Sequence, residues 1–531
     1  MTVKETIRRE IDADDIQAIA RAGFGSLNAA RYMLLRITEV DTAREWLRSV
    51  APASVAQLPA EHGQEICQIA FTAAGLRALG VTCDIVRRFA PEFVEGMAGD
   101  ENRSRRLGDT GANAPANWSW GVGDKEPHVL LMLFSDATKI EAFADWMMSD
   151  ALAAGLSRIE VLSDTDMDNV EPFGFRDGIS QPSFDWDRPR TPGTKADQDY
   201  TNLIALGELL LGYRNEYGLL TERPLLDASE KNAGMLPSGP RDRHDLGRNG
   251  SYLVYRQLAQ DVRGFWRWVA DEAARCGISK EELAQSMVGR ELHGSPLADL
   301  TVGRAIPGVS PRHEGSNDFL FDTDPDGLSC PLGAHIRRAN PRTGDVPGGR
   351  KGPLDSFLTM LGLTARRDRD PTSSTLPWPR NTTVWPIFRS EDDSIASARF
   401  HRILRRGREY GEKLDRDAAL APAAAEEKER GIHFLCLNAN IARQFEFVQG
   451  AWIASAKFAA LTGEQDPLLG NREPFPNTPI ANPPQPTDGF SRPGAPPCCQ
   501  HARGLPQFVR VRGGAYFFLP GLAALKWITS N

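Results

Sequence analysis

The chain has 531 residues and a formal net charge of −8. Apolar residues make up 41% and charged residues 25% of it, which is ordinary globular usage and excludes a wholly disordered, collagen-like or disulfide-stapled miniprotein. No run of 18 uncharged apolar residues occurs, so no transmembrane helix is expected. The acidic balance argues against nucleic acid or an anionic membrane as a partner, and the length predicts two or three domains.

The first 180 residues alternate between strand-like and helix-like patterns. Apolar runs predict strands at 31–38, 64–72, 127–134 and 158–162. Apolar residues at helical spacing predict helices at 40–50, 73–80 and 136–154. This β-α-β, β-α-β order is typical of a ferredoxin-like α+β unit, so we expect one such module over 1–180.

The rest of the chain repeats this order on a larger scale. Residues 181–248 lack periodicity and predict a long connection. Within 249–531, strands are expected at 251–258, 394–406, 430–438 and 507–518, and helices at 259–275, 279–289 and 440–462. Two stretches, 343–393 and 464–506, are too polar and too rich in proline to form a core and predict insertions. The fold class expected is therefore α+β with two ferredoxin-like modules.

The compartment is indicated by the cysteines and the first residues. The chain has seven cysteines, and none forms a CxxC pair. Only Cys498 and Cys499 are adjacent, and the other five are widely separated. This usage is typical of reduced thiols. Arg8-Arg9 is followed by the acidic run 10–15 and not by the apolar segment of an export signal. We therefore predict a cytoplasmic protein. Cys498, Cys499 and His501 offer only a poor metal site, since adjacent cysteines rarely chelate one ion and no fourth ligand is evident.

Three local clusters carry residues suited to chemistry. In 174–180 (GFRDGIS), two glycines bracket Asp177, so the backbone can approach a planar ligand closely, although a tight turn capped by the aspartate explains the same pattern. In 330–342 (CPLGAHIRRANPR), His335 stands among small residues and is followed by three arginines. In 403–411 (ILRRGREYG), several cations end a predicted strand, and a solvated strand end is the alternative.

The histidine cluster is the most telling of the three. A lone histidine is usually a core residue, but three cations beside one imidazole suit an anionic ligand with carboxylate arms. Haem has two propionates and needs one axial base, whereas zinc needs more ligands than His335 can recruit locally. No GxSxG or Walker A sequence occurs.

Taken together, the three clusters resemble motifs of the dye-decolourising peroxidase family of haem enzymes. GFRDG resembles the family's distal-aspartate motif, CPLGAHIRRANPR its proximal-histidine motif, and ILRRGREYG the segment with its distal arginine. Shorter matches, among them Gly207-Glu208 with Leu211-Gly212-Tyr213, extend the resemblance over about residues 30–525.

The resemblance implies two ferredoxin-like modules with one haem b per chain, bound between them or in the second. His335 would be the axial ligand of the iron, and Asp177 and Arg405 the catalytic residues on the open face. Glu409 stands where the family usually has proline, which leaves Arg406 as an alternative to Arg405. The other residues implied to contact haem or its propionates are Gly178, Ile179, Ser180, Arg290, Asn340, Pro341 and Arg342.

A carboxylate is expected on the second nitrogen of the proximal imidazole, with Glu446 and Asp261 as candidates. Donors too large to reach a buried haem would need a surface aromatic residue, for which Trp378, Trp385 and Tyr410 are candidates.

The function implied is a haem peroxidase that reduces hydrogen peroxide and oxidises dyes, phenolics or similar small aromatic donors, with a homo-oligomer left open. The alternative is a non-catalytic protein that binds or handles haem, which would need His335 but neither Asp177 nor Arg405. A third hypothesis is a structural α+β protein whose arginines bind another carboxylated ligand. The presence of both distal residues favours the enzyme.

Overall fold

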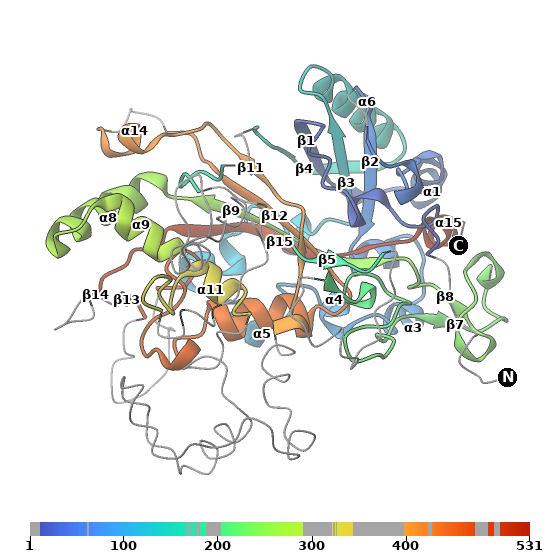
Figure 1. Ribbon diagram of the computed structural model, residues 1–531. Helices are drawn as coiled ribbons and strands as arrows, with labels where there is room; N and C mark the ends of the chain where they lie inside the picture. Colours follow the sequence, from blue (N-terminus) through green and yellow to red (C-terminus); the bar gives the residue numbers. More distant parts are fainter. Residues whose placement is uncertain are drawn as a thin grey trace, which may run out of the picture.

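The computed structural model describes residues 11–60, 63–166, 170–175, 178, 181–186, 203–289, 321, 324, 327–342, 398–422, 427–472, 487–492 and 500–530. Its centre is a nine-stranded sheet in the order β10-β12-β9-β15-β2-β3-β1-β4, with β11 also paired to β12 (Figure 1). The two halves of this sheet meet at β15 and β2, through the single pair Phe518–Phe71.

The N-terminal half is a ferredoxin-like unit. Its strands are β1 (Ala29–Ile37), β2 (Ile66–Phe71), β3 (Val129–Ser135) and β4 (Leu156–Ser163), all antiparallel to their neighbours. The long helices α1 (Val40–Ser49) and α6 (Ile140–Ala153) follow β1 and β3. Shorter helices lie between β2 and β3, namely α2 (Ala73–Ala78), α3 (Cys83–Val86), α4 (Pro91–Glu95) and α5 (Glu101–Leu107). Every residue of β2 and β3 is buried, which explains their unbroken apolar sequence.

The C-terminal half repeats the strand order. Its strands are β9 (Ser251–Gln260), β10 (Leu404–Arg405), β11 (Arg408–Tyr410), β12 (Gly431–Asn438) and β15 (Val509–Leu519). The order β10-β12-β9-β15 corresponds to β2-β3-β1-β4. The helices are α8 (Val262–Cys276), α9 (Lys280–Val288), α11 (His335–Ala339), α14 (Arg416–Leu420) and α15 (Leu522–Ser530). The expected α+β class with ferredoxin-like character is confirmed.

Short strands complete the described part. They pair as β5 (Ser183–Phe184) with β6 (Leu203–Ile204), β7 (Leu225–Leu226) with β8 (His244–Asp245), and β13 (Phe490–Arg492) with β14 (Gln500–Ala502). In the described ranges, no helix is long and apolar enough to cross a membrane.

Three expectations need correction. The strand predicted over 394–406 is reduced, among its described residues, to Leu404–Arg405, because residues 398–401 turn. The helix predicted over 440–462 is made of wide π turns at Ala442–Glu446 and Val448–Ile453 and a 3-10 turn at Phe458–Ala460. The stretch 464–506 does contribute to the core: Leu468, Phe490, Ala502 and Leu505 are buried in the apolar cluster that also contains α8 residues. The stretch 343–393 lies outside the described residues.

The alternation of β9 separates two apolar layers. Tyr252 and Val254 belong to the layer that contains residues of α1 and α6, whereas Leu253 and Tyr255 belong to the opposite layer. Further along the strand, Leu258 and Gln260 face a cavity. The sheet therefore forms one wall of this cavity in its C-terminal half.

Candidate active site

A large cavity lies against the C-terminal half of the sheet. Its walls come from β9 and β12, from α11, and from the π turns that follow β12. The hollow measures about 1520 Å³ with its open mouth included. Most of its lining is apolar, including Leu258, Val288, Ile336, Phe434, Phe445, Trp452 and Val509. Such a cavity suits a bulky, largely apolar ligand.

His335 lines this cavity and has a buried carboxylate as its partner. It is the first residue of α11, and its Nδ1 lies 2.9 Å from Oδ2 of Asp466. Asp466 is fully buried, and its Oδ1 accepts hydrogen bonds from the backbone N–H groups of Leu468 (2.9 Å) and Leu469 (2.8 Å). Because Nδ1 is directed at the carboxylate, Nε2 is the ring nitrogen placed to bind a ligand or metal.

The electrostatics keep Asp466 ionised. Burial raises the pKa of this carboxyl, but the charge and hydrogen bond of His335, the N–H of Leu469 and the charge of Arg338 together outweigh burial, so its pKa lies below the ordinary value. An ionised carboxylate fixes the imidazole in one tautomer and makes its other nitrogen more basic.

The two predicted partners of His335 are therefore wrong. Glu446 accepts a hydrogen bond from the Tyr516 hydroxyl (2.9 Å) and pairs with Arg103 (2.8 Å). Asp261 caps α8 by accepting the N–H of Gly264 (2.8 Å). The true partner lies 131 residues beyond His335. It stands in a stretch dismissed as too polar for the core, and no local sequence signal links it to the histidine.

Of the three arginines after His335, Arg337 and Arg338 form hydrogen bonds within the protein. Arg338 is fully buried and donates to the carbonyls of Gly333, Trp452, Ser455 and Glu464, and burial lowers its pKa to about 10. Arg337 is also buried and donates to Asp324 and to the carbonyl of Cys330. Both therefore anchor α11 within the protein.

The end of this motif does face the cavity. Arg342 is buried, lines the cavity and has a backbone φ of +56°. Asn340 lines it as well, and its Oδ1 is buried with no hydrogen-bond partner among the described residues. Pro341, between them, is buried. The Asn340 side-chain oxygen is therefore a buried acceptor on the cavity wall.

Arg405 and Arg406 have different surroundings. Arg405, in β10, lies opposite Cys436 of β12 and lines the cavity. Arg406 donates from Nε to the carbonyl of Ile19 (2.9 Å), and burial lowers its pKa to about 10. Because successive side chains of an extended segment point to opposite faces, only the first of the two reaches the cavity. Gly407 explains the close approach to β12, since a Cβ there would lie 2.3 Å from the carbonyl oxygen of His433.

The cluster around Asp177 is described only in part. Asp177, Ile179, Ser180 and Arg290 lie outside the described residues. Gly178 has a φ of +80°, in the region that favours glycine. Before the cluster, Glu171 and Phe175 line the cavity, and the Glu171 carboxylate accepts the N–H groups of Phe173 (3.0 Å) and Phe175 (2.9 Å). The start of this segment is therefore fixed at the cavity wall.

Two cavity residues, His401 and Arg402, were missed by the sequence analysis. They directly precede the 403–411 cluster, which was the available signal. The His401 ring stacks on Phe447 with centroids 3.6 Å apart, and its Nδ1 contacts the carbonyl oxygen of Arg443. Arg402 is 6% exposed. Among the described residues, the arginines of the cavity wall are therefore Arg342, Arg402 and Arg405.

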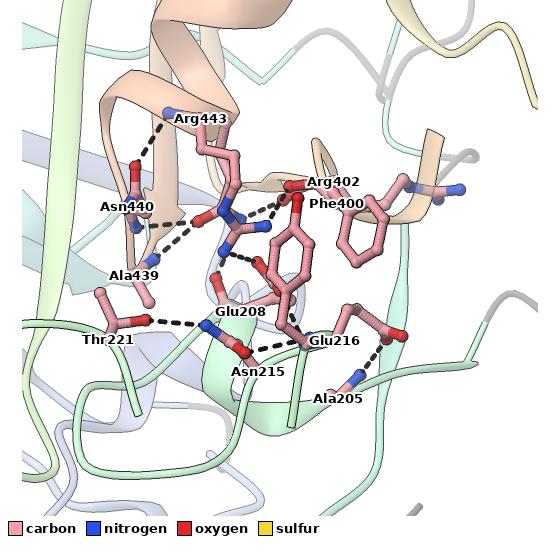
Figure 2. Close-up of polar contacts among 12 residues, drawn as sticks. Ala205, Glu208, Asn215, Glu216, Thr221, Phe400, Arg402, Ala439, Asn440 and Arg443 are labelled. Atoms are coloured by element: carbon pink, nitrogen blue, oxygen red, sulfur yellow. Dashed lines mark hydrogen bonds and ion pairs between the residues drawn. The ribbon is translucent and has the colours of Figure 1, made fainter. Parts of the chain in front are cut away.

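A buried ion pair holds this part of the wall in place (Figure 2). Glu208 is fully buried and accepts from Arg443 Nη2 at 2.6 Å, while Nη1 of the same arginine donates to the carbonyl of Phe400 at 2.6 Å. The neighbouring Gln444 donates to the carbonyls of Glu208 (2.9 Å) and Arg402. Glu208 of the Gly207-Glu208 motif thus holds the backbone next to the cavity residues His401 and Arg402 through Arg443 and Gln444.

Other predicted residues lie elsewhere. Tyr410 is buried, donates to Glu429 (3.1 Å) and stacks on His433, so it is not a surface residue. Trp378, Trp385, Cys498 and Cys499 lie outside the described residues. His501 contacts Ser491 Oγ at 2.9 Å. Within the described ranges, no group of three or more histidine, cysteine, aspartate or glutamate side chains could hold a metal ion.

The cavity residues fit a haem. Its apolar walls suit a flat macrocycle, and one imidazole with an anionic partner suits an axial ligand. Arginines on the cavity wall supply charge for two propionates.

The chain is similar to curated peroxidases along most of its length. It is 27% identical over 522 residues to a multifunctional dye peroxidase of Amycolatopsis sp., covering 95% of this chain and 90% of that protein. It is also 27% identical to a dye-decolorizing peroxidase of Mycetinis scorodonius, covering 87% and 76%. No family model matches the chain.

Solved structures give the same fold. The DyP-type peroxidase of Anabaena sp. superposes with a TM-score of 0.65 at 20% identity, covering 97% of this chain and 94% of the other. A fungal DyP-type peroxidase of Auricularia auricula-judae gives 0.67 at 23% identity, covering 98% and 100%.

Proposed function

We propose that this chain, which belongs to the dye-decolorizing peroxidase family, is a haem peroxidase that reduces hydrogen peroxide with electrons from dyes, phenolics or similar aromatic donors. The observation that carries the proposal is one cavity lined both by His335, with its ionised carboxylate partner, and by Arg405. A protein that only stores or carries haem needs the first of these and not the second.

The haem site would be built from the cavity residues already described. His335 Nε2 would be the axial ligand, with Asp466 holding the imidazole in the ligating tautomer. Arg342 and Arg402 would neutralise the propionates. Gly178, Ile179, Ser180, Arg290, Asn340 and Pro341 are proposed as further contacts, and haem b as the cofactor.

When bound, haem supplies the redox centre that accepts oxidising equivalents from peroxide and passes them to donors one at a time. The protein contributes a proton carrier and a fixed charge. Asp177 would take a proton from one peroxide oxygen and return it to the departing oxygen, provided it lies within about 3 Å directly or through one water. The Arg405 cation would stabilise the negative charge that develops on the departing oxygen.

The compartment is part of the proposal. The five described cysteines, Cys67, Cys83, Cys276, Cys330 and Cys436, are free thiols. Free thiols in a chain with sparse cysteines support a reducing, cytoplasmic environment.

The first experiment is the absorbance spectrum of the haem-supplemented protein before and after one equivalent of hydrogen peroxide. A Soret band that changes within seconds and recovers on adding a phenolic donor is the expected result. His335→Ala should lose haem binding, whereas Arg405→Leu should keep it and react slowly with peroxide. A stable Soret band that ignores peroxide would overturn the enzymatic proposal in favour of haem binding alone. No Soret band would overturn both.

A further inference from the structure

We infer that Gln181 is a positioning residue for peroxide activation, because its side-chain amide ties the chain just after the Asp177 segment to the backbone of Arg405. This inference rests on the proposed function. It assigns Gln181 no contact with peroxide or haem.

The contact has two parts. Gln181 Oε1 accepts the backbone N–H of Arg405 at 3.0 Å, and Gln181 Nε2 donates to the backbone carbonyl of the same residue at 3.2 Å. One planar amide therefore engages both polar groups of a single residue 224 positions away. Arg405 is one of the residues that line the cavity, so Gln181 holds the backbone of a cavity residue.

The position of β10 explains why this contact matters. β10 has only two residues and lies at the end of the sheet, paired on one side with β12. An edge strand leaves N–H and C=O groups without a neighbouring strand. Gln181 supplies that missing partner at Arg405, so the side-chain amide acts as a one-residue extension of the sheet. The direction of the arginine side chain depends on this backbone being fixed.

The start of the segment 171–181 is also held by the sheet. The Glu171 carboxylate, which closes the turn to Phe175, accepts Gln260 Nε2 at 2.9 Å, and Gln260 belongs to β9. The chain from 171 to 181 is thus tied to β9 at its start and to β10 at its end. Only residues 176–180, which include Asp177, connect the two anchors. The described residues on both sides of this stretch, Glu171 and Gln181, are therefore held by strands of the sheet.

The need to place two groups on one peroxide sets the expected loss of rate. Proton transfer by Asp177 and charge stabilisation by Arg405 must act on the same peroxide, and a misplacement of about 1 Å costs roughly 10²-fold in rate. Gln181→Leu, which keeps the volume and removes both hydrogen bonds, should therefore slow the reaction with peroxide by about ten- to a hundredfold. Haem loading should stay unchanged, since the His335 side of the cavity is untouched.

The chain offers a matched control in Gln17. Its amide makes the same pair of bonds to one residue, accepting the N–H of Ile69 (2.9 Å) and donating to the Ile69 carbonyl (2.9 Å) in the N-terminal half. Gln17→Leu should lower the melting temperature at least as much as Gln181→Leu. It should leave the rate with peroxide within about twofold of the wild type.

The experiment combines stopped-flow absorbance of the haem-loaded protein with hydrogen exchange of the peptide containing β10. Gln181→Leu should slow the Soret change after peroxide and speed exchange of the Arg405 amide, while adding little to the loss already caused by Arg405→Leu. Equal rates for wild type and Gln181→Leu, or additive losses in the double variant, would overturn the inference. An unreactive wild type would instead refute the proposed function, and hydrogen exchange would still decide whether Gln181 holds Arg405.

Discussion

The substitution Asp466→Asn tests the His335–Asp466 pair without opening a hole. The wild-type carboxylate faces three donors, namely Nδ1–H of His335 and the N–H groups of Leu468 and Leu469. An amide has one acceptor and one donor group in the same volume. If its oxygen stays on the two backbone N–H groups, its NH₂ faces the imidazole and forces the tautomer protonated at Nε2. That tautomer cannot ligate iron.

The expected loss of haem affinity follows from the effect of such a carboxylate on a ligating histidine. Losing the hydrogen-bond partner of a ligating histidine costs about 10- to 100-fold in metal affinity or activity, which corresponds to about 1.4–2.7 kcal/mol. The alanine variant would be a poorer probe. It would leave three buried donors without acceptors at roughly 1–3 kcal/mol each, which is comparable with the whole stability of a folded domain of about 5–15 kcal/mol.

The assay is a haem titration followed by Soret absorbance, together with the iron–histidine stretching frequency of the reduced protein. Asp466→Asn should weaken haem binding about 10- to 100-fold and lower the stretching frequency. Asp245→Asn is the control, because Asp245 is also buried, accepts a backbone N–H from Arg248 (3.0 Å) and pairs with Arg223, away from the cavity. Wild-type haem affinity and an unchanged frequency in Asp466→Asn would refute the assignment of this carboxylate.

Three further outcomes can be measured in parallel. Arg405→Leu should slow the reaction with peroxide at least tenfold, whereas Arg406→Leu should change it less than twofold and lower the melting temperature, because only the first lines the cavity. Glu208→Gln should weaken haem binding several-fold and lower stability by about 3 kcal/mol in urea unfolding, because it leaves the Arg443 cation without its anion. Burial lowers the pKa of His433 to about 4. Below about pH 6.5 the unfolded chain therefore takes up a proton at this residue, whereas the folded chain does not, and the free energy of unfolding should fall by about 1 kcal/mol per pH unit down to about pH 4. The substitution His433→Asn should reduce that slope in guanidinium unfolding.

The sequence predicted what depends on local patterns. Strands buried on both faces, such as β3, appear as unbroken apolar runs, and their bounds agree with the structure to within two residues. The same reasoning selected the clusters that contain His335 and Arg405, because each has an unusual composition, and both residues line the cavity. It failed for Asp466 and Gln181, whose roles arise from contacts across 131 and 224 residues. Their partners are set by tertiary packing, and the neighbouring residues in the sequence do not indicate which residues those partners are.

The repeated topology also explains where this cavity lies. In the N-terminal half, apolar side chains such as Leu47 of α1 and Phe143 of α6 are buried in one cluster with the strands. In the C-terminal half, α8 packs instead with α9 and α14, and the chain after β12 winds in π turns, so strand residues such as Leu258 line a hollow.

Such a hollow lowers the stability of the empty protein, because apolar surface that a helix could cover remains unburied. A ligand that binds only the folded chain restores this by mass action, about 4 kcal/mol at a thousandfold excess over its dissociation constant. Haem should therefore raise the melting temperature of the wild type by several degrees, and that of His335→Ala far less. The same melting temperature with and without haem, in a protein that displays a Soret band, would mean that haem binds outside this cavity.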